Sequence, residues 1–192
     1  MKSASLLVYV PGIPFTPDHL VPQRELAAVA AVLALAGHDT QILDFGTLDA
    51  LQRMATPTLR AQARRLVECT GDAGPWVLAP DGRTRHETER LRPLLDNARE
   101  RRDVALAAEV RARHRLDFVA FFARTGADAA EVVGAAALLR GIRPDLPLLL
   151  FGPYAEQFGT HFMTATRHLD AAATGEAETT LPAWAACCGD PA

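Results

Sequence analysis

Short apolar runs alternate with amphipathic helical patterns along most of the chain. Five runs are long enough for a strand but too short for a helix: Ser5–Val10, His38–Phe45, Leu116–Ala123, Leu146–Phe151 and Leu169–Thr174. Four segments place apolar residues at helical spacing: 23–36, Ala129–Arg140, Tyr154–Thr164 and Glu178–Ala186. Strands that alternate with helices form right-handed crossovers. We therefore expect an α/β fold, a doubly wound five-stranded parallel sheet with the flavodoxin-like (Rossmann-like) strand order 2-1-3-4-5.

Two of these helices carry terminal signals. Gly37 follows the first helix and is predicted to end it, because glycine readily adopts the left-handed conformation of a helix C-terminus. Asp128 is predicted to cap the helix Ala129–Arg140, with Glu131 completing a capping box. Gly141 is predicted to stop that helix.

The middle of the chain, 47–115, shows no clear strand pattern and is predicted to be a helical insertion. Its expected helices are Thr58–Glu68, His86–Asn97 and Arg101–Arg115, with a loop over Cys69–Arg85. From Asp81 to Arg115 ten arginines stand beside seven acidic residues. Two interpretations are open: a solvated face with i,i+4 ion pairs, or a docking surface for a partner. The predicted organisation is one α/β domain over 1–186, with this insertion, and a tail over 187–192.

Composition limits the possible functions. The 192 residues carry a formal net charge of −3, which predicts no preference for nucleic acid or membranes. The three cysteines form neither a disulfide framework nor a zinc motif, and we expect reduced thiols. No signal peptide and no transmembrane run is visible, so a cytoplasmic location is expected.

The predicted strands end in turns that place small residues at one edge of the sheet. These turns are Pro11-Gly12, Arg124-Thr125-Gly126, Gly152-Pro153-Tyr154 and Gly175-Glu176. Open α/β folds bind ligands at this carboxyl edge, and glycine lets a backbone approach a ligand closely. The alternative is that such turns need glycine for their own geometry. Four together favour a ligand site.

Several familiar chemistries lack their motifs. The first strand is followed by no GxGxxG, and the chain contains no GxxxxGK[ST], GxSxG or HExxH. Lys2 is the only lysine, so a phosphate-binding loop lysine is missing. The six histidines show no metal-ligand spacing.

Three segments resemble a known family. AGHDTQILDFG (Ala36–Gly46) is similar to the second-strand segment of the cobalamin (B12)-binding domains at the N-terminus of many B12-dependent radical SAM enzymes. FGPYA (Phe151–Ala155) is similar to their fourth-strand turn, which usually begins Gly-Gly-Pro. TGEAETTLPAW (Thr174–Trp184) is similar to their Gly-Glu-Gly-Glu signature. The resemblance covers about 1–46 and 116–186.

The resemblance implies a corrinoid, cobalamin, laid across the carboxyl edge of the sheet. Carried over by position, the cofactor-binding residues would be Pro11, Gly12, Thr125, Gly152, Pro153, Tyr154, Gly175 and Glu176. The DxHxxG motif that supplies a cobalt ligand in other cobalamin modules is absent, so base-off binding without a protein histidine is expected. Phe151 and Ala177 stand where the family has glycine, and either side chain would narrow the groove if it pointed into it.

The radical SAM half is not visible in this sequence. No CxxxCxxC is present to hold an iron–sulfur cluster, so the chain is not expected to be catalytic alone. It is a stand-alone module, part of a longer protein, or a relative that has lost its ligand. The leading hypothesis is a module that presents a corrinoid to a separate radical SAM partner of the methyltransferase type, contacted through 47–115. The alternatives are a ligand-free interaction subunit that keeps the fold for docking, and part of a nucleotide-using α/β enzyme such as a glycosyltransferase.

Overall fold

The computed structural model describes residues 2–12, 23–70 and 82–188. Some predictions fall outside these ranges, namely part of the loop over Cys69–Arg85 and the end of the tail over 187–192. The described chain divides into two compact units, Met1–Thr47 with Leu106–Ala192, and Leu48–Ala105. Each unit is described by itself.

The first unit contains the predicted sheet. Its five strands run parallel in the order β2-β1-β3-β4-β5, which confirms the flavodoxin-like prediction. The strands are β1 (Ala4–Tyr9), β2 (Asp39–Asp44), β3 (Phe118–Phe122), β4 (Leu148–Phe151) and β5 (Ala171–Ala172). β5 is shorter than the predicted Leu169–Thr174, because only Ala171 and Ala172 pair with β4 at this outer position.

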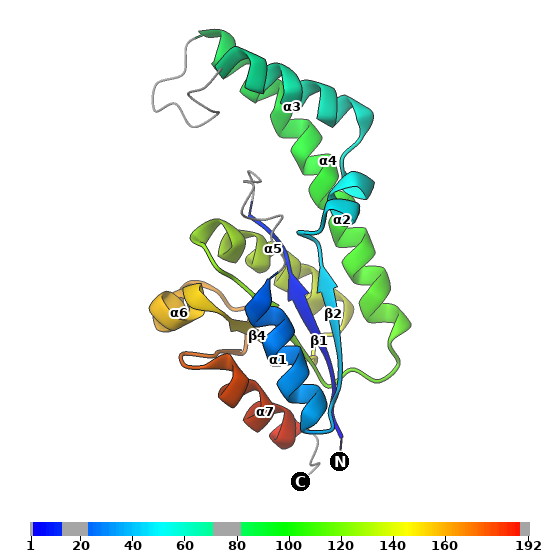
Figure 1. Ribbon diagram of the computed structural model, residues 1–192, viewed down its shortest axis with the longest axis vertical. Coiled ribbons are helices and arrows are strands. Elements are labelled where there is room, and N and C mark those ends of the chain that lie inside the picture. The colour runs from blue at the N-terminus through cyan, green and yellow to red at the C-terminus, as the bar shows by residue number, and fades with distance from the viewer. Residues whose placement is uncertain (1, 13–22, 71–81, 189–192) are drawn as a thin grey trace. The chain divides into compact units, whose positions relative to one another are not determined.

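Helices cover both faces of this sheet. α1 (Arg24–Leu35) and α7 (Ala177–Cys188) pack side by side on one face, and α5 (Gly126–Ile142) lies on the other (Figure 1). α6 (Pro153–Ala165) packs beside β4 and β5. Gly37 ends α1 with a φ of 87°, as predicted.

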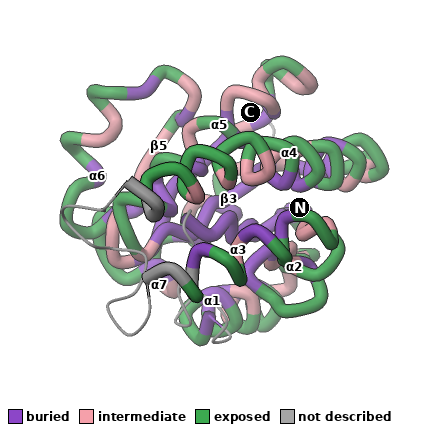
Figure 2. The backbone as a smooth tube through the Cα atoms, turned by 90° about the horizontal axis from the view of Figure 1, so that it is seen from above, coloured by how far each residue is buried: buried purple, intermediate pink, exposed green. Residues whose placement is uncertain are grey.

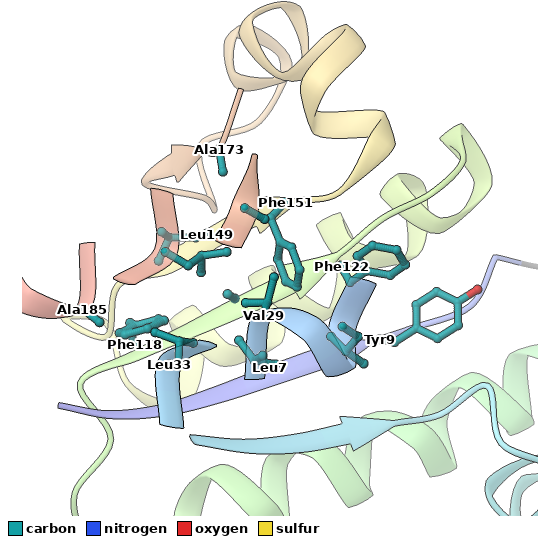
Figure 3. Packing of buried hydrophobic residues seen from close by; sticks show 14 residues of the cluster. Leu7, Tyr9, Val29, Leu33, Phe118, Phe122, Leu149, Phe151, Ala173 and Ala185 are labelled. Carbon is teal, nitrogen blue, oxygen red and sulfur yellow. The ribbon is translucent and has the colours of Figure 1, made fainter. Parts of the chain in front are cut away.

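The central strands β1, β3 and β4 are buried along their whole length, as expected for a parallel sheet with two covered faces (Figure 2). On the face covered by α1 and α7, alternate strand residues and helix residues form one apolar cluster (Figure 3). The cluster includes Leu7, Tyr9, Leu26, Val29, Leu33, Phe118, Phe122, Leu149, Phe151, Ala177 and Leu181.

The ends of α5 differ from the prediction. The N-cap is Thr125, whose side chain accepts the Asp128 N–H, and the Asp128 side chain accepts the Thr125 N–H to complete the capping box. Asp128 is therefore the third residue of the helix, and Glu131 is not part of the box. The helix continues past Gly141 to Ile142, because a glycine inside a packed helix lowers its stability without ending it.

The second unit is helical, with α2 (Leu48–Met54), α3 (Pro57–Thr70) and the larger part of α4 (Gly82–Ala112). The two predicted helices over 86–115 are one continuous helix. The stretch 97–101 between them contains neither glycine nor proline, and Pro93 is accommodated inside the helix. Exposed ion pairs at i,i+4 and i,i+3 spacing, Arg53–Asp49 and Arg99–Asp96, lie on these helices, as a solvated charged face would have. None of the helices in the described ranges combines the length and apolar character needed to span a bilayer.

Candidate functional site at the carboxyl edge of the sheet

Backbone N–H groups of the turns after β1 and β3 donate hydrogen bonds to the same side chain, the carboxylate of Asp128. Asp128 is fully buried; its Oδ1 accepts the Gly12 N–H at 2.6 Å, and its Oδ2 accepts the Thr125 N–H at 2.9 Å and the Arg124 N–H at 3.0 Å. A Cβ on Gly12 would lie 2.5 Å from the Ala127 Cβ. Gly12 is thus required by its close approach to α5, and Pro11 is buried beside it.

The turn after β4 is equally constrained. Gly152 has φ 98° and ψ −178°, a region that is essentially restricted to glycine. A Cβ there would lie 2.6 Å from the Phe122 ring and 2.9 Å from the Ala123 carbonyl oxygen. Pro153 begins α6, and the Tyr154 N–H donates to the Ala123 carbonyl at 3.1 Å. This hydrogen bond joins the turn after β4 to the end of β3.

The Tyr154 side chain is half-buried and reaches the turn after β3. Its ring carbon Cε2 would lie 3.5 Å from a Cβ on Gly126. On α6 its ring packs against Phe158 and Phe162, with centroid distances of 5.1 Å and 5.5 Å. Tyr154 therefore stands between the turns after β3 and β4, at the start of an aromatic cluster.

The turn after β5 is open. Gly175 and Glu176 are exposed, and a Cβ on Gly175 would meet only the Thr180 hydroxyl oxygen, at 4.0 Å. The Glu176 carbonyl accepts the N–H groups of Thr179 and Thr180, so this turn leads directly into α7. Unlike Gly12 and Gly152, Gly175 is not required by contacts within the described protein.

Phe151 and Ala177, which replace family glycines, do not point into a groove. Phe151 is 0% exposed and its ring lies 5.4 Å from that of Phe122 in the apolar cluster (Figure 3). Ala177 is 7% exposed and belongs to the same cluster. Both side chains are directed to the core under α1 and α7 and leave the carboxyl edge unobstructed.

The sequence interpretation missed two polar residues at this edge. Tyr9, the last residue of β1, is 0% exposed, and its hydroxyl has no hydrogen-bond partner among the described residues. Asp44, the last residue of β2, is its register partner. Burial raises the pKa of Asp44, and the Gly46 N–H, which donates to its Oδ1 at 2.7 Å, partly opposes that shift. The available signal for Tyr9 was its polar hydroxyl directly after the apolar run Leu6–Val8, at the end of the strand.

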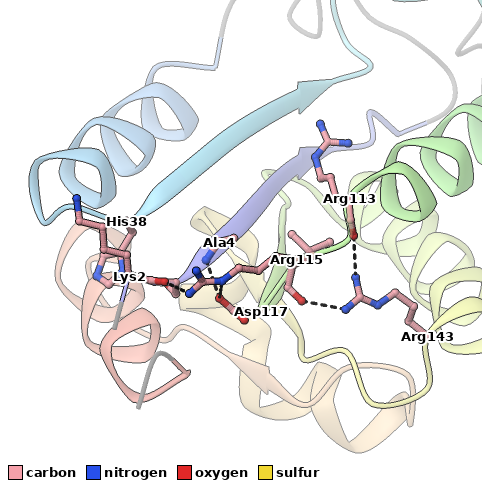
Figure 4. A network of polar contacts seen from close by, with 9 residues as sticks. Lys2, Ala4, His38, Arg113, Arg115, Asp117 and Arg143 are labelled. Carbon is pink, nitrogen blue, oxygen red and sulfur yellow. Dashed lines mark hydrogen bonds and ion pairs between the residues drawn. The ribbon is translucent and has the colours of Figure 1, made fainter. Parts of the chain in front are cut away.

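The opposite edge of the sheet holds a polar network with a structural role (Figure 4). The Asp117 carboxylate accepts the Ala4 N–H at 2.7 Å, and Arg115 donates to the Lys2 carbonyl. Arg143 donates to the carbonyls of Arg113 and Leu116. These contacts join the starts of β1 and β3 to the end of α5. A surface cleft of about 400 Å³ lies beside them, lined by Val110, Arg111, Arg113, His114, Ile142 and Arg143.

No group of three or more potential metal-ligating side chains occurs within the ranges that the structure describes. Comparison with protein-family models, with curated proteins and with solved structures finds no match to this chain.

Proposed function

We propose that this chain binds a corrinoid at the carboxyl edge of its sheet and presents it to a separate radical SAM protein. The orientation of Phe151 and Ala177 carries the proposal. Both residues stand where the family has glycine, and both side chains pack into the apolar cluster. Neither side chain therefore occupies space at the carboxyl edge where the ligand would lie. The five-stranded parallel sheet with order 2-1-3-4-5 is the scaffold that the resemblance implies.

The eight proposed contact residues lie together at one end of the sheet, as the proposal requires. Six of them lie in the turns that follow the carboxyl ends of β1, β3, β4 and β5, and Pro153 and Tyr154 are the first two residues of α6. Hydrogen bonds join the turns after β1, β3 and β4 to one another. These turns are therefore held in place before a ligand binds, which lowers the entropic cost of binding. The turn after β5 leaves backbone exposed, as close contact with a bulky ligand requires.

The corrinoid would supply a cobalt-bound methyl group to the partner. This chain's own residues would hold and orient it: Tyr154 offers an aromatic surface, and the turn at Gly175 offers backbone amide and carbonyl groups. We expect base-off binding, since the sequence has no DxHxxG motif to replace the lower cobalt ligand. The helical unit Leu48–Ala105 is the proposed partner contact.

Retention of a corrinoid tests the proposal. The purified chain is mixed with hydroxocobalamin and desalted, and its visible spectrum is recorded. We expect near-stoichiometric retention with a base-off spectrum. A base-on spectrum would contradict the proposed geometry, and a colourless protein would refute binding.

A pair of glycine variants locates the ligand. Gly175→Val adds bulk at the open turn, where an added Cβ meets only the Thr180 hydroxyl oxygen, at 4.0 Å. Gly141→Val adds the same bulk at the far end of α5, where an added Cβ has nothing within 4 Å. We expect Gly175→Val to reduce corrinoid retention at least tenfold and Gly141→Val to leave it unchanged. Equal retention by the two variants would place the ligand elsewhere.

A ligand-free docking subunit is the second candidate, and two exposed apolar residues of the helical unit favour it. Leu48 is 61% exposed and Val104 is 64% exposed. If docking is the function, Leu48→Asp and Val104→Asp should weaken binding of the radical SAM protein in size-exclusion chromatography whether or not corrinoid is added. Binding that depends on loaded corrinoid would favour the first candidate.

For the nucleotide-using alternative, the N-terminus of α5 is a poor phosphate site. A helix N-terminus at the end of a parallel strand is where a nucleotide phosphate binds, because its N–H groups are free. At α5 the Asp128 carboxylate already accepts the neighbouring N–H groups and places a negative charge there. A phosphate at that position would be repelled.

A further inference from the structure

The hydroxyl of Tyr9 is buried, and no described residue lies at hydrogen-bond distance and angle from it. The ring belongs to the apolar cluster and packs edge-on against Phe122, with centroids 5.7 Å apart. The hydroxyl points away from that cluster, at the last residue of β1 (Figure 3). Buried polar groups are almost always hydrogen-bonded, so an unpartnered one at a candidate ligand edge calls for an external acceptor.

Asp128 is close to this hydroxyl but is already engaged. Its carboxylate accepts three backbone N–H groups, from Gly12, Arg124 and Thr125. Burial raises the pKa of Tyr9, and so do the charges of Asp128 and Asp44 and, as the smallest contribution, a hydrogen-bonding interaction with Asp128; the charge of Arg124 lowers it. The Tyr9 hydroxyl is therefore protonated at neutral pH and available to donate.

Asp44 supplies the complementary acceptor. Tyr9 and Asp44 are register partners in adjacent parallel strands, so their side chains leave the sheet on the same face, about 4.8 Å apart at the backbone. Asp44 Oδ1 accepts the Gly46 N–H, and Oδ2 has no hydrogen-bond partner within the described part of the chain. An O–H donor and a carboxylate acceptor therefore lie on the same face of the sheet, at the carboxyl ends of neighbouring strands.

The local charges restrict which ligand group fits this pair. Among the described residues, the charges that affect the pKa of Tyr9 are two carboxylates, of Asp44 and Asp128, and one guanidinium, of Arg124. An anionic group such as phosphate or carboxylate would be repelled. A primary carboxamide fits, because its oxygen accepts one hydrogen bond while its nitrogen donates another.

We propose that Tyr9 and Asp44 form a donor–acceptor pair that receives a carboxamide of the ligand, with Tyr9 donating to the amide oxygen and Asp44 accepting from the amide nitrogen. This inference rests on the proposed function and deepens it. It makes the two side chains specificity-determining residues for an amide-bearing ligand.

The test compares ligands and variants together. Dissociation constants are measured by visible absorbance for hydroxocobalamin and for its b-, d- and e-monocarboxylic acids, in which one peripheral amide is hydrolysed. The proteins are the parent, Tyr9→Phe, Asp44→Asn and a matched control, Asp145→Asn, which changes an exposed carboxylate in the turn before β4.

We expect Tyr9→Phe and Asp44→Asn each to bind hydroxocobalamin about tenfold more weakly, which corresponds to about 1.4 kcal/mol, with Asp145→Asn unchanged. The parent should discriminate at least tenfold against one of the three acids, and Asp44→Asn should lose that discrimination because the repelling charge is gone. The urea midpoint of Tyr9→Phe should equal or exceed that of the parent, since an unpaired buried hydroxyl is removed.

Parent-like binding by Tyr9→Phe and Asp44→Asn would overturn the inference and leave the proposed function standing. Equal binding of all three acids by the parent would also overturn it. Failure of the parent to bind hydroxocobalamin would refute the proposed function, and the inference with it.

Discussion

Replacement of Gly152 by alanine should destabilise the sheet unit severely. Two separate costs arise at this residue. Its backbone, with φ 98° and ψ −178°, lies in a region that is nearly restricted to glycine, and an alanine held there costs about 1–3 kcal/mol. The added Cβ would also stand 2.6 Å from the Phe122 ring and 2.9 Å from the Ala123 carbonyl oxygen.

Neither the Phe122 ring nor the Ala123 carbonyl can move away from the added Cβ without losing contacts. The Phe122 ring is fully buried between Tyr9 and Phe151, and the Ala123 carbonyl already accepts the Tyr154 N–H. Overpacking of this kind costs roughly 1–3 kcal/mol. The two costs together give about 2–6 kcal/mol, a large part of the roughly 5–15 kcal/mol by which a domain is stable.

Urea unfolding followed by circular dichroism measures this effect. With a urea dependence of about 2 kcal/mol/M, a loss of about 4 kcal/mol lowers the midpoint by about 2 M. Gly141→Ala is the matched control, because a Cβ there has nothing within 4 Å and lies inside a helix, where alanine is favoured over glycine by up to about 1 kcal/mol. A Gly152→Ala midpoint within 0.5 M of the parent, a tolerance set at about 1 kcal/mol for the same slope, would refute the steric argument.

Three further predictions concern charged groups. Asp128→Ala should lower stability by about 2–4 kcal/mol, because three backbone N–H groups lose their acceptor; an unchanged urea midpoint would contradict this. Asp44→Asn should gain stability over the parent as pH rises. Burial raises the pKa of Asp44 in the folded state, so its contribution is fully present at acid pH and is lost above that pKa; a stability difference independent of pH between 4 and 7 would disprove it. Arg143→Ala should cost about 1–3 kcal/mol through two carbonyls that lose a donor, yet leave hydroxocobalamin affinity unchanged; weaker binding would place the ligand at the wrong edge.

The strand order was predictable because the fold leaves few choices. Short apolar runs separated by helical patterns dictate right-handed crossovers, and the order 2-1-3-4-5 is one of the common orders for such a sheet. Helix boundaries were less predictable. Thr125 and Asp128 are three residues apart, and both are good N-cap residues. Only the backbone geometry shows that Thr125 is the N-cap and that Asp128, inside the helix, accepts the Thr125 N–H.

The direction of Phe151 could not be obtained from the sequence. β4 is buried at every position, so its pattern is continuous and does not indicate which side chains face α1 and α7. The need for a hydrogen bond at Tyr9 was hidden for a related reason. Tyrosine is common in strands, and only packing shows that its ring is enclosed while its hydroxyl lacks a partner in the described ranges.

The three turns that contain the predicted contact glycines, Gly12, Gly152 and Gly175, do not carry equal weight as signs of a ligand. Gly12 is needed because it contacts α5, and Gly152 is needed because it contacts Phe122. Any protein with this fold and these neighbours would keep both glycines, with or without a corrinoid. Gly175 has no such internal reason, since a side chain there would enter open space. A glycine that the fold does not need, at the edge where such folds bind ligands, is the position where substitution separates ligand binding from stability. Gly175→Val should therefore lower corrinoid retention while its urea midpoint stays within about 0.5 M of the parent, about 1 kcal/mol at a typical slope.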